Sequence, residues 1–193
     1  MKLSEIVVVS RGERLYLDTM VIVAYFHKGH RLHANAEKLI ANIEKVKYEG
    51  VISSLTLMEF IKVLRDACVE DNRMNIAENE EEIKSKINYL YRINNLCFVE
   101  GRPPEFDAME EVKSVYFNTI SQKAFEILCK HCGSIIKNKD EEFEHQGVHA
   151  MDALHLALAK VLDCDKIVTD ENAFREVKSE LDVLMLNDAN VLF

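Results

Sequence analysis

The sequence has few of the residues that divide a chain into separate domains. Its 193 residues include only two Pro and six Gly. We find no internal repeat and no tract rich in Pro, Gly or Ser that would form a linker. A chain of this length and hydrophobic content can bury one substantial core. We therefore expect a single domain over residues 1–193.

Long apolar runs are also missing from the N-terminal region. The aliphatic stretch 6–9 is too short for the core of a signal peptide or for a membrane span. Five Cys, an odd number, are better explained as reduced thiols than as a disulfide framework. Cys129 and Cys132 have zinc-like spacing, but no second pair follows, so we interpret them as helix-end thiols. We expect a cytoplasmic protein without membrane association.

The sequence lacks two features that would point directly to nucleotide or nucleic-acid binding. It has no Gly-rich phosphate loop and no dinucleotide fingerprint. It also has no basic excess, because the net charge is -9. Segments 70–82 and 140–144 carry -5 and -4, which together account for that whole excess of acids. We interpret both segments as solvated surface, with a basic protein partner as the alternative, so RNA binding is not excluded.

Short β-type runs alternate with longer helical patterns along the chain, which is typical of a parallel sheet covered on both faces. The predicted strands are 6–9, 15–17, 51–53, 96–99, 166–169 and 183–186, the first forming a hairpin with the second across 11–13. The predicted helices are 20–26, 32–47, 55–69, 81–94, 108–131 and 148–162. In such α/β sheets, ligands bind beyond the carboxyl ends of the strands.

Four acidic residues occupy positions where this architecture places ligand sites. Asp18 and Asp170 each follow a predicted strand, whereas Glu59 and Asp152 lie in strongly apolar helical segments. An ionised side chain among aliphatic neighbours needs a compensating charge or hydrogen bonds. Carboxylate oxygens suit Mg²⁺ or Mn²⁺, and such a site favours phosphodiester hydrolysis by metal-activated water. The four acids therefore predict a metal-dependent hydrolase of phosphodiesters.

Each of these residues also has an ordinary explanation when it is considered alone. An Asp after a strand is commonly a turn former or a helix N-cap. A Glu near a helix start is commonly a capping partner or a member of an ion pair. His155 lies on the same helix as Asp152 and is explained either as a packed core histidine, which we favour, or as a residue supporting the metal site. The four acids together are harder to explain in this way.

The order and context of the acids resemble the PIN-domain family, especially the toxin ribonucleases of VapBC toxin–antitoxin modules. Four segments carry the resemblance: LYLDTMVIVAYF, SLTLMEFIKVL, AMDALHLALA and VTDENAF. The resemblance implies a three-layer α/β/α sandwich on a central, mainly parallel sheet. The second and third motifs lie farther apart than in compact members, which predicts a helical insertion around 70–147.

The resemblance also implies roles for individual residues and partners. Asp18, Glu59, Asp152 and Asp170 would be the metal ligands and catalytic residues. Thr19 and Thr169 would supply supporting hydroxyl groups, and Asn172 would orient a water molecule or ligand. RNA cleavage would release 3′-hydroxyl and 5′-phosphate ends. The protein would form a homodimer, with a small antitoxin as a further partner.

A run of basic and imidazole side chains follows the first motif: His27, Lys28, His30, Arg31 and His33. We expect Lys28 and Arg31 to bind RNA phosphates near the site, and a solvated loop is the alternative. The sequence thus predicts a Mg²⁺- or Mn²⁺-dependent endoribonuclease, either the toxin of a toxin–antitoxin pair or an RNA-processing nuclease. The alternative is a non-catalytic PIN-like module that binds RNA or protein.

Overall fold

A computed structural model of the chain describes residues 12–70, 76–99, 110–131, 135–137, 143–145 and 148–191. Five strands form one sheet in the order β3-β2-β1-β6-β7, and every neighbouring pair is parallel. Their bounds are β1 Arg14–Leu17, β2 Glu49–Ser53, β3 Leu96–Val99, β6 Lys166–Thr169 and β7 Asp182–Met185. The predicted parallel sheet is therefore confirmed.

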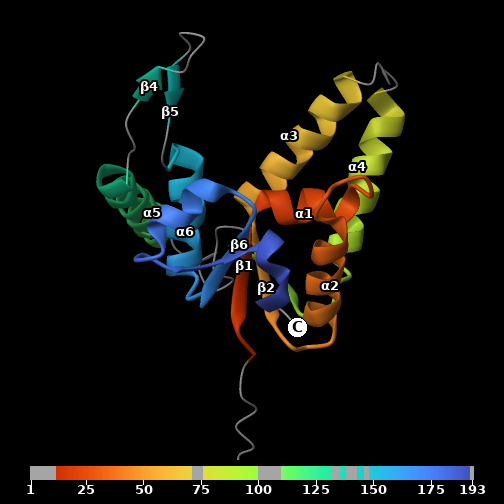
Figure 1. The fold of residues 1–193 in the computed structure, drawn as a ribbon, viewed down its shortest axis with the longest axis horizontal. Helices are drawn as coiled ribbons and strands as arrows, with labels where there is room; N and C mark the ends of the chain where they lie inside the picture. The colour runs from red at the N-terminus through yellow and green to blue at the C-terminus, as the bar shows by residue number, and fades with distance from the viewer. Residues whose placement is uncertain are drawn as a thin grey trace, which may run out of the picture.

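Helices cover both faces of this sheet. Their bounds are α1 Thr19–Phe26, α2 His33–Glu44, α3 Ser54–Glu70, α4 Ile76–Leu90, α5 Glu110–His131 and α6 Ala150–Val161, with 3₁₀ helices η2 Asn172–Val177 and η3 Leu186–Val191. Helices α1 to α4 lie on one side of the sheet and α5 and α6 lie on the other (Figure 1). The fold is the expected three-layer α/β/α sandwich.

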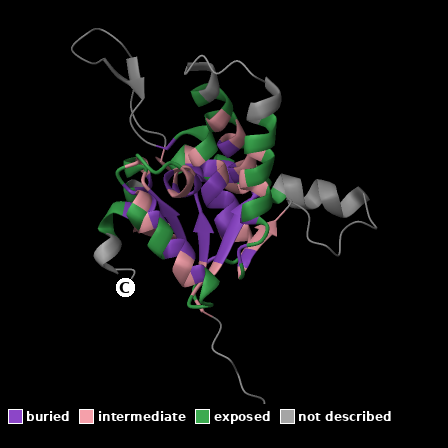
Figure 2. Cartoon of the chain, turned by 90° about the vertical axis from the view of Figure 1, so that its right-hand side faces the viewer, coloured by how far each residue is buried: buried purple, intermediate pink, exposed green. Residues whose placement is uncertain are grey.

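The strands contribute alternate side chains to two cores. On β1, Leu15 and Leu17 belong to the core beneath α1 to α4, whereas Tyr16 belongs to the core beneath α5 and α6. All three side chains are fully buried, and the centre of the sheet is buried throughout (Figure 2). Because both faces are covered, these strands are apolar without the alternation typical of a half-exposed sheet.

The register of the central strands determines which residues meet at the carboxyl edge of the sheet. Leu17 on β1 pairs with Val168 on β6. The backbone N–H of Asp18 continues this ladder and donates to the Val168 carbonyl over 3.0 Å. The ends of β1 and β6 are therefore in register, and the residues that follow them are neighbours.

The segment 70–147, predicted to hold a helical insertion, contains α4 and α5 but also a strand of the main sheet. Strand β3 pairs with β2 and forms one edge of the sheet. The sequence did not predict β4 (Ile135–Lys137) and β5 (Phe143–His145), which form a separate antiparallel pair. This segment is therefore partly integral to the core, and the single domain over 1–193 remains a prediction.

Several predicted boundaries differ from those observed. Helix α2 ends at Glu44 rather than at 47, and Val46 follows with a φ of 61°. Helix α4 starts at Ile76 and ends at Leu90 rather than spanning 81–94, and Asn95 has a φ of 63°. Apolar periodicity does not mark where the backbone turns left-handed, so such ends are missed. The predicted strand 6–9 and its hairpin lie outside the described residues.

None of the helices in the described parts of the chain is both long and apolar enough to span a lipid bilayer.

Candidate active site at the carboxyl edge of the sheet

The strand order reverses between β1 and β6. Within the sheet, β2 and β3 lie on one side of β1, and β6 and β7 lie on its other side. In open α/β sheets such a reversal leaves a crevice outside the carboxyl ends of the two strands. Asp18 follows β1 and Asp170 follows β6. Two of the four predicted acids therefore flank the switch point.

Asp18 is held in place by hydrogen bonds from both strand ends. It is the N-cap of α1, and its Oδ1 accepts the backbone N–H of Thr19 over 2.7 Å. The hydroxyl of Thr169 donates to Oδ2 over 2.6 Å. Burial raises the pKa of this carboxyl group, and the neighbouring His155 ring and the Thr169 hydroxyl only partly oppose the rise. Asp18 is therefore both the N-cap of α1 and part of the candidate site.

Glu59 approaches Asp18 from α3. This helix begins after Ser53, whose Oγ accepts the Thr56 backbone N–H over 3.3 Å, as expected of an N-cap. The Oε2 atom of Glu59 accepts hydrogen bonds from the Thr19 hydroxyl and from the Nε2 atom of His155. Burial alone would raise the pKa of Glu59, but these two hydrogen bonds, together with the charges of His155 and Lys62, lower it overall.

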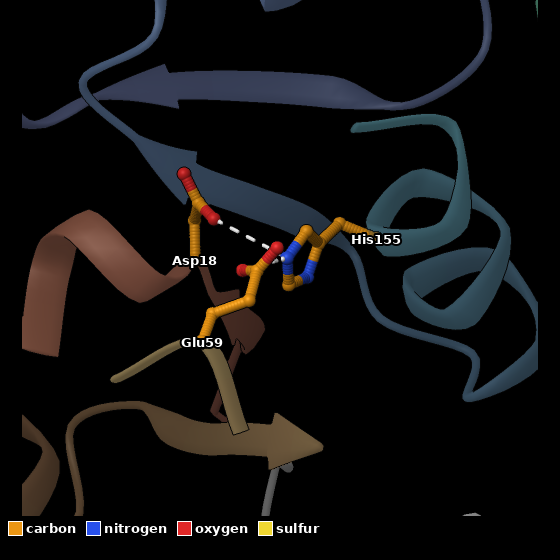
Figure 3. A group of neighbouring side chains, drawn as sticks. All are labelled: Asp18, Glu59 and His155. Atoms are coloured by element: carbon orange, nitrogen blue, oxygen red, sulfur yellow. Dashed lines mark hydrogen bonds and ion pairs between the residues drawn. The ribbon is translucent and has the colours of Figure 1, made fainter. Parts of the chain in front are cut away.

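His155 completes the cluster from α6. Its Nε2 lies 2.8 Å from Glu59 Oε2 and 3.7 Å from Asp18 Oδ1, and the three side chains converge between their elements (Figure 3). One potential ligand atom from each of Asp18, Glu59 and His155 lies within 4.8 Å of the others. The imidazole is 2% exposed. Our interpretation of His155 as a packed histidine therefore describes its burial but missed its contact with the acids.

Asp152 and Asp170 lie outside this cluster. Asp152 accepts the backbone N–H of His149 over 3.0 Å at the start of α6. Asp170 forms an ion pair with the guanidinium of Arg31, and its Oδ1 is buried without a hydrogen-bond partner among the described residues. Both acids still share the electrostatic environment of Asp18. Burial, followed by the charges of Asp18, Asp152 and Asp170, raises the pKa of nearby Glu171.

The remaining predicted residues surround this region. Thr19 is buried and donates to Glu59, while Thr169 donates to Asp18. Asn172 is the first residue of η2, two positions after Asp170, and is exposed. Lys28 is also exposed, in the turn between α1 and α2.

Sequence reasoning missed a set of buried polar groups behind the acids. The Tyr16 hydroxyl lies 2.7 Å from Ser53 Oγ and 2.8 Å from His155 Nδ1. Thr56 Oγ1 lies within 3.4 Å of both Tyr16 and Ser53 and donates to the Leu17 carbonyl. A Tyr in a strand buried on both faces and a His in an apolar helix each require a polar partner, and that signal was present in the sequence.

The donor set fits a divalent cation. Carboxylate oxygens are hard ligands suited to Mg²⁺ or Mn²⁺. Among the described residues, no Lys or Arg forms an ion pair with Asp18 or Glu59, although both lie in a region of several acids. The unpartnered Oδ1 of Asp170 is a further atom available to a cation. These residues could therefore hold a cation. Its positive charge would compensate Asp18 and Glu59, with which no described Lys or Arg forms an ion pair.

Two solved structures are similar to this chain. The chain is similar to VapBC2 from Rickettsia felis, solved bound to a DNA fragment from its promoter, with 17% identity, a TM-score of 0.51, and coverage of 89% of this chain and 98% of that chain. It is also similar to VapC20 from Mycobacterium tuberculosis, described as a toxin that cleaves the sarcin–ricin loop, with 14% identity, a TM-score of 0.49, and coverage of 84% and 94%.

The sequence itself carries the family assignment. No curated protein matches the chain. The sequence model of the PIN domain, however, matches residues 15–180, which is most of the chain and spans all four predicted motifs. The chain therefore belongs to the PIN-domain family, a family of nucleases.

Proposed function

We propose that this protein is a Mg²⁺- or Mn²⁺-dependent endoribonuclease that hydrolyses RNA phosphodiester bonds and leaves 3′-hydroxyl and 5′-phosphate ends. The observation that carries the proposal is the convergence of Asp18 and Glu59 with His155, within 4.8 Å, at the switch point of a PIN fold. Two acids from a strand end and a separate helix meet where α/β proteins bind ligands.

Asp18, Glu59, Asp152 and Asp170 would hold the cation, directly or through water. A cation held there would supply the positive charge that activates an attacking water and offsets charge developing on the phosphate. The described contacts indicate what the chain contributes. Thr169 and the Thr19 backbone fix the carboxylate of Asp18. Burial of Asp18, which is 5% exposed, keeps bulk water from screening its charge.

Arg31 and Lys28 would bind RNA phosphates at the rim of the site. The side chain of Arg31 is 64% exposed, and its guanidinium already reaches the Asp170 carboxylate. It can therefore contact a phosphate beside that acid without a large rearrangement of the backbone. A planar guanidinium is well suited to bind two phosphate oxygens at once. Lys28 lies in the same turn and would add a second positive charge.

We also propose that the protein forms a homodimer and that a small antitoxin regulates it, as in VapBC modules. Membership of the PIN-domain family supports both proposals. Light scattering of the purified chain would measure the mass in solution. Co-expression with a short open reading frame adjacent to its gene, followed by purification and an RNA cleavage assay, would test for an inhibitory antitoxin.

The decisive experiment compares the wild type with Asp18→Asn on structured RNAs, with Mg²⁺ or Mn²⁺ and with EDTA. We expect cleavage to fall on the order of a hundredfold or more in the variant and in EDTA, because each removes part of the metal site. Asp66→Asn makes the same change at an exposed position of α3 and should cleave like the wild type. Cleavage that survives both EDTA and Asp18→Asn would contradict the mechanism.

RNA binding without cleavage would favour the alternative to an enzyme. If the wild type binds Mn²⁺ and RNA but cleaves none of a broad panel of RNAs, the protein is a non-catalytic PIN-like binding module.

A further inference from the structure

A series of buried hydrogen bonds runs from Ser53, just before α3, to the carboxylate of Glu59. Its two intermediate residues belong to other elements of the fold. Ser53 lies at the end of β2, Tyr16 on β1 and His155 on α6. Their contacts are 2.7 Å from Ser53 Oγ to the Tyr16 hydroxyl, 2.8 Å from that hydroxyl to His155 Nδ1, and 2.8 Å from His155 Nε2 to Glu59 Oε2. Tyr16 and His155 are buried at 0% and 2% exposure.

The hydrogen-bonding capacity of each group determines the direction of this series. A carboxylate oxygen only accepts, so the contact with Glu59 requires the proton on His155 Nε2. In the neutral imidazole with its proton on Nε2, Nδ1 accepts a hydrogen bond from the Tyr16 hydroxyl. Ser53 can in turn donate to Tyr16, because its oxygen accepts the backbone N–H of Thr56.

The same contacts define how the Glu59 carboxylate is oriented. Both hydrogen bonds that described side chains make to this group end on Oε2, one from Thr19 and one from His155. The other oxygen, Oε1, receives neither of them. A carboxylate held through one oxygen by two donors presents its second oxygen in a defined direction.

We infer that His155 is a positioning residue, which receives a hydrogen bond from Tyr16 and donates one to Glu59, so that Glu59 is pre-oriented to bind the divalent cation. This inference rests on the proposed function, because it assigns His155 a role at the same metal site. It makes His155 a support of a ligand rather than a ligand, since its Nε2 lone pair is replaced by an N–H. The hydrogen bond also keeps the acid in place in the absence of the cation.

Packing alone would not require this arrangement. The ring of His155 makes an edge-to-face contact with Tyr16, with ring centroids 5.7 Å apart, and an apolar side chain could fill the same volume. An apolar replacement would remove the His155 contact from the Tyr16 hydroxyl and one of the two hydrogen bonds that Glu59 Oε2 accepts. The hydrogen bonds that join Tyr16 on β1, His155 on α6 and Glu59 on α3 therefore distinguish a positioning role from core packing.

A matched pair of substitutions separates the two ring nitrogens. The amide N–H of His155→Gln can reach the place of Nε2 and donate to Glu59. The shorter side chain of His155→Asn ends near Nδ1, so it can bond Tyr16 but cannot reach Glu59. His155→Leu removes both contacts while keeping an apolar group of similar size. Each variant is first checked for cooperative urea unfolding, which reports on packing.

The primary measurement is Mn²⁺ affinity of the full-length protein, read from the electron paramagnetic resonance signal of free Mn²⁺. We expect the Kd to rise about tenfold or more in His155→Asn and His155→Leu, and to stay within about threefold of the wild type in His155→Gln. Equal Mn²⁺ affinity in the wild type, Asn and Leu variants would overturn the inference while leaving the proposed nuclease function intact.

Two spectroscopic measurements test the geometry independently of catalysis. Electron spin-echo spectra of bound Mn²⁺ should show no modulation from a coordinated imidazole nitrogen, and such modulation would make His155 a ligand and overturn the inference. Nitrogen NMR of the metal-free protein should find a proton on Nε2, and a ring protonated only on Nδ1 would overturn it too. If the wild type binds no Mn²⁺ and cleaves no RNA with any metal, the proposed function fails and this role fails with it.

Discussion

The hydroxyl of Thr169 donates a hydrogen bond to Asp18 Oδ2 over 2.6 Å, although 151 positions separate the two residues in the chain. The contact exists because β1 and β6 are parallel neighbours that end in register. It connects the first and fourth family motifs at the reversal of strand order. A strand-end Asp that would otherwise be a simple helix cap thereby becomes a fixed, buried carboxylate within an acidic cluster.

Replacing Thr169 with Val tests this connection. The side chains have nearly the same shape, but Val cannot donate to Asp18 or accept from the Glu171 backbone N–H, which lies 3.0 Å from the Thr169 hydroxyl. We expect the free energy of unfolding to fall by about 1–3 kcal/mol, since a buried acceptor loses its donor. Urea unfolding measures the change. Ser85→Ala, on the exposed surface of α4, should change stability by no more than about 0.5 kcal/mol.

The ion pair between Arg31 and Asp170 predicts an effect on RNA binding rather than on stability. Arg31→Gln should leave the free energy of unfolding within about 0.5 kcal/mol, because the guanidinium is largely exposed to solvent. In an Asp18→Asn background, which prevents cleavage, RNA affinity should fall roughly 3–10-fold and its salt dependence should weaken by about one ion. Fluorescence anisotropy across a salt series measures both quantities.

Arg92→Gln provides the control for that experiment, because it removes the same charge from an exposed position in the turn that follows α4. It should leave RNA affinity unchanged. If both Arg variants weaken binding equally, the effect reflects net charge, and Arg31 has no specific phosphate contact.

A larger residue in place of Gly50 on β2 should create a packing defect on the face beneath α2. A Cβ atom at this position would lie 2.7 Å from Leu96 Cδ1 and 2.8 Å from Ile43 Cδ1. Both neighbours are buried, so they can yield only by disturbing the core. We expect Gly50→Ala to lower the free energy of unfolding by about 1–3 kcal/mol, measured by urea unfolding. Unchanged stability would show that these side chains repack at no cost.

We expect Glu180 to make a pH-dependent contribution to the free energy of unfolding. Lys130, Lys160 and His131 surround its carboxylate, and hydrogen bonds from Lys130 and then Lys160 lower its pKa to about 2. Because the folded pKa lies below the unfolded value of 4.5, the contribution is complete above that value and is lost as the pH falls toward 2. We expect Glu180→Gln to destabilise the protein by about 1–2 kcal/mol at neutral pH, given the exposure of Lys130.

The measurement is urea unfolding of Glu180→Gln and wild type from about pH 7 to about pH 3. The difference between them should shrink steadily below the unfolded pKa. A difference that stays constant across this range would show that the carboxylate charge of Glu180 does not stabilise the fold.

Local patterns in the sequence were sufficient for most of the elements and for the fold class. Strands β1, β2, β3 and β6 were recognised because fully buried parallel strands are short, apolar and bounded by polar residues. The four acids were recognisable because an acid in an apolar segment or directly after a strand is unusual in that setting. The antiparallel pair β4–β5 was missed, since three-residue strands carry almost no periodic signal.

Only the tertiary structure decided which of these residues meet. Glu59 and His155 are 96 positions apart, and Arg31 and Asp170 are 139 positions apart, so no local pattern connects either pair. Strand order and register bring Asp18, Glu59 and His155 together, while Asp152 turns to the N-terminus of its own helix. The sequence by itself determined most of the elements and the acids, because burial and periodicity are local properties. Hydrogen-bond partners were decided by the packing of three layers, which depends on the whole chain.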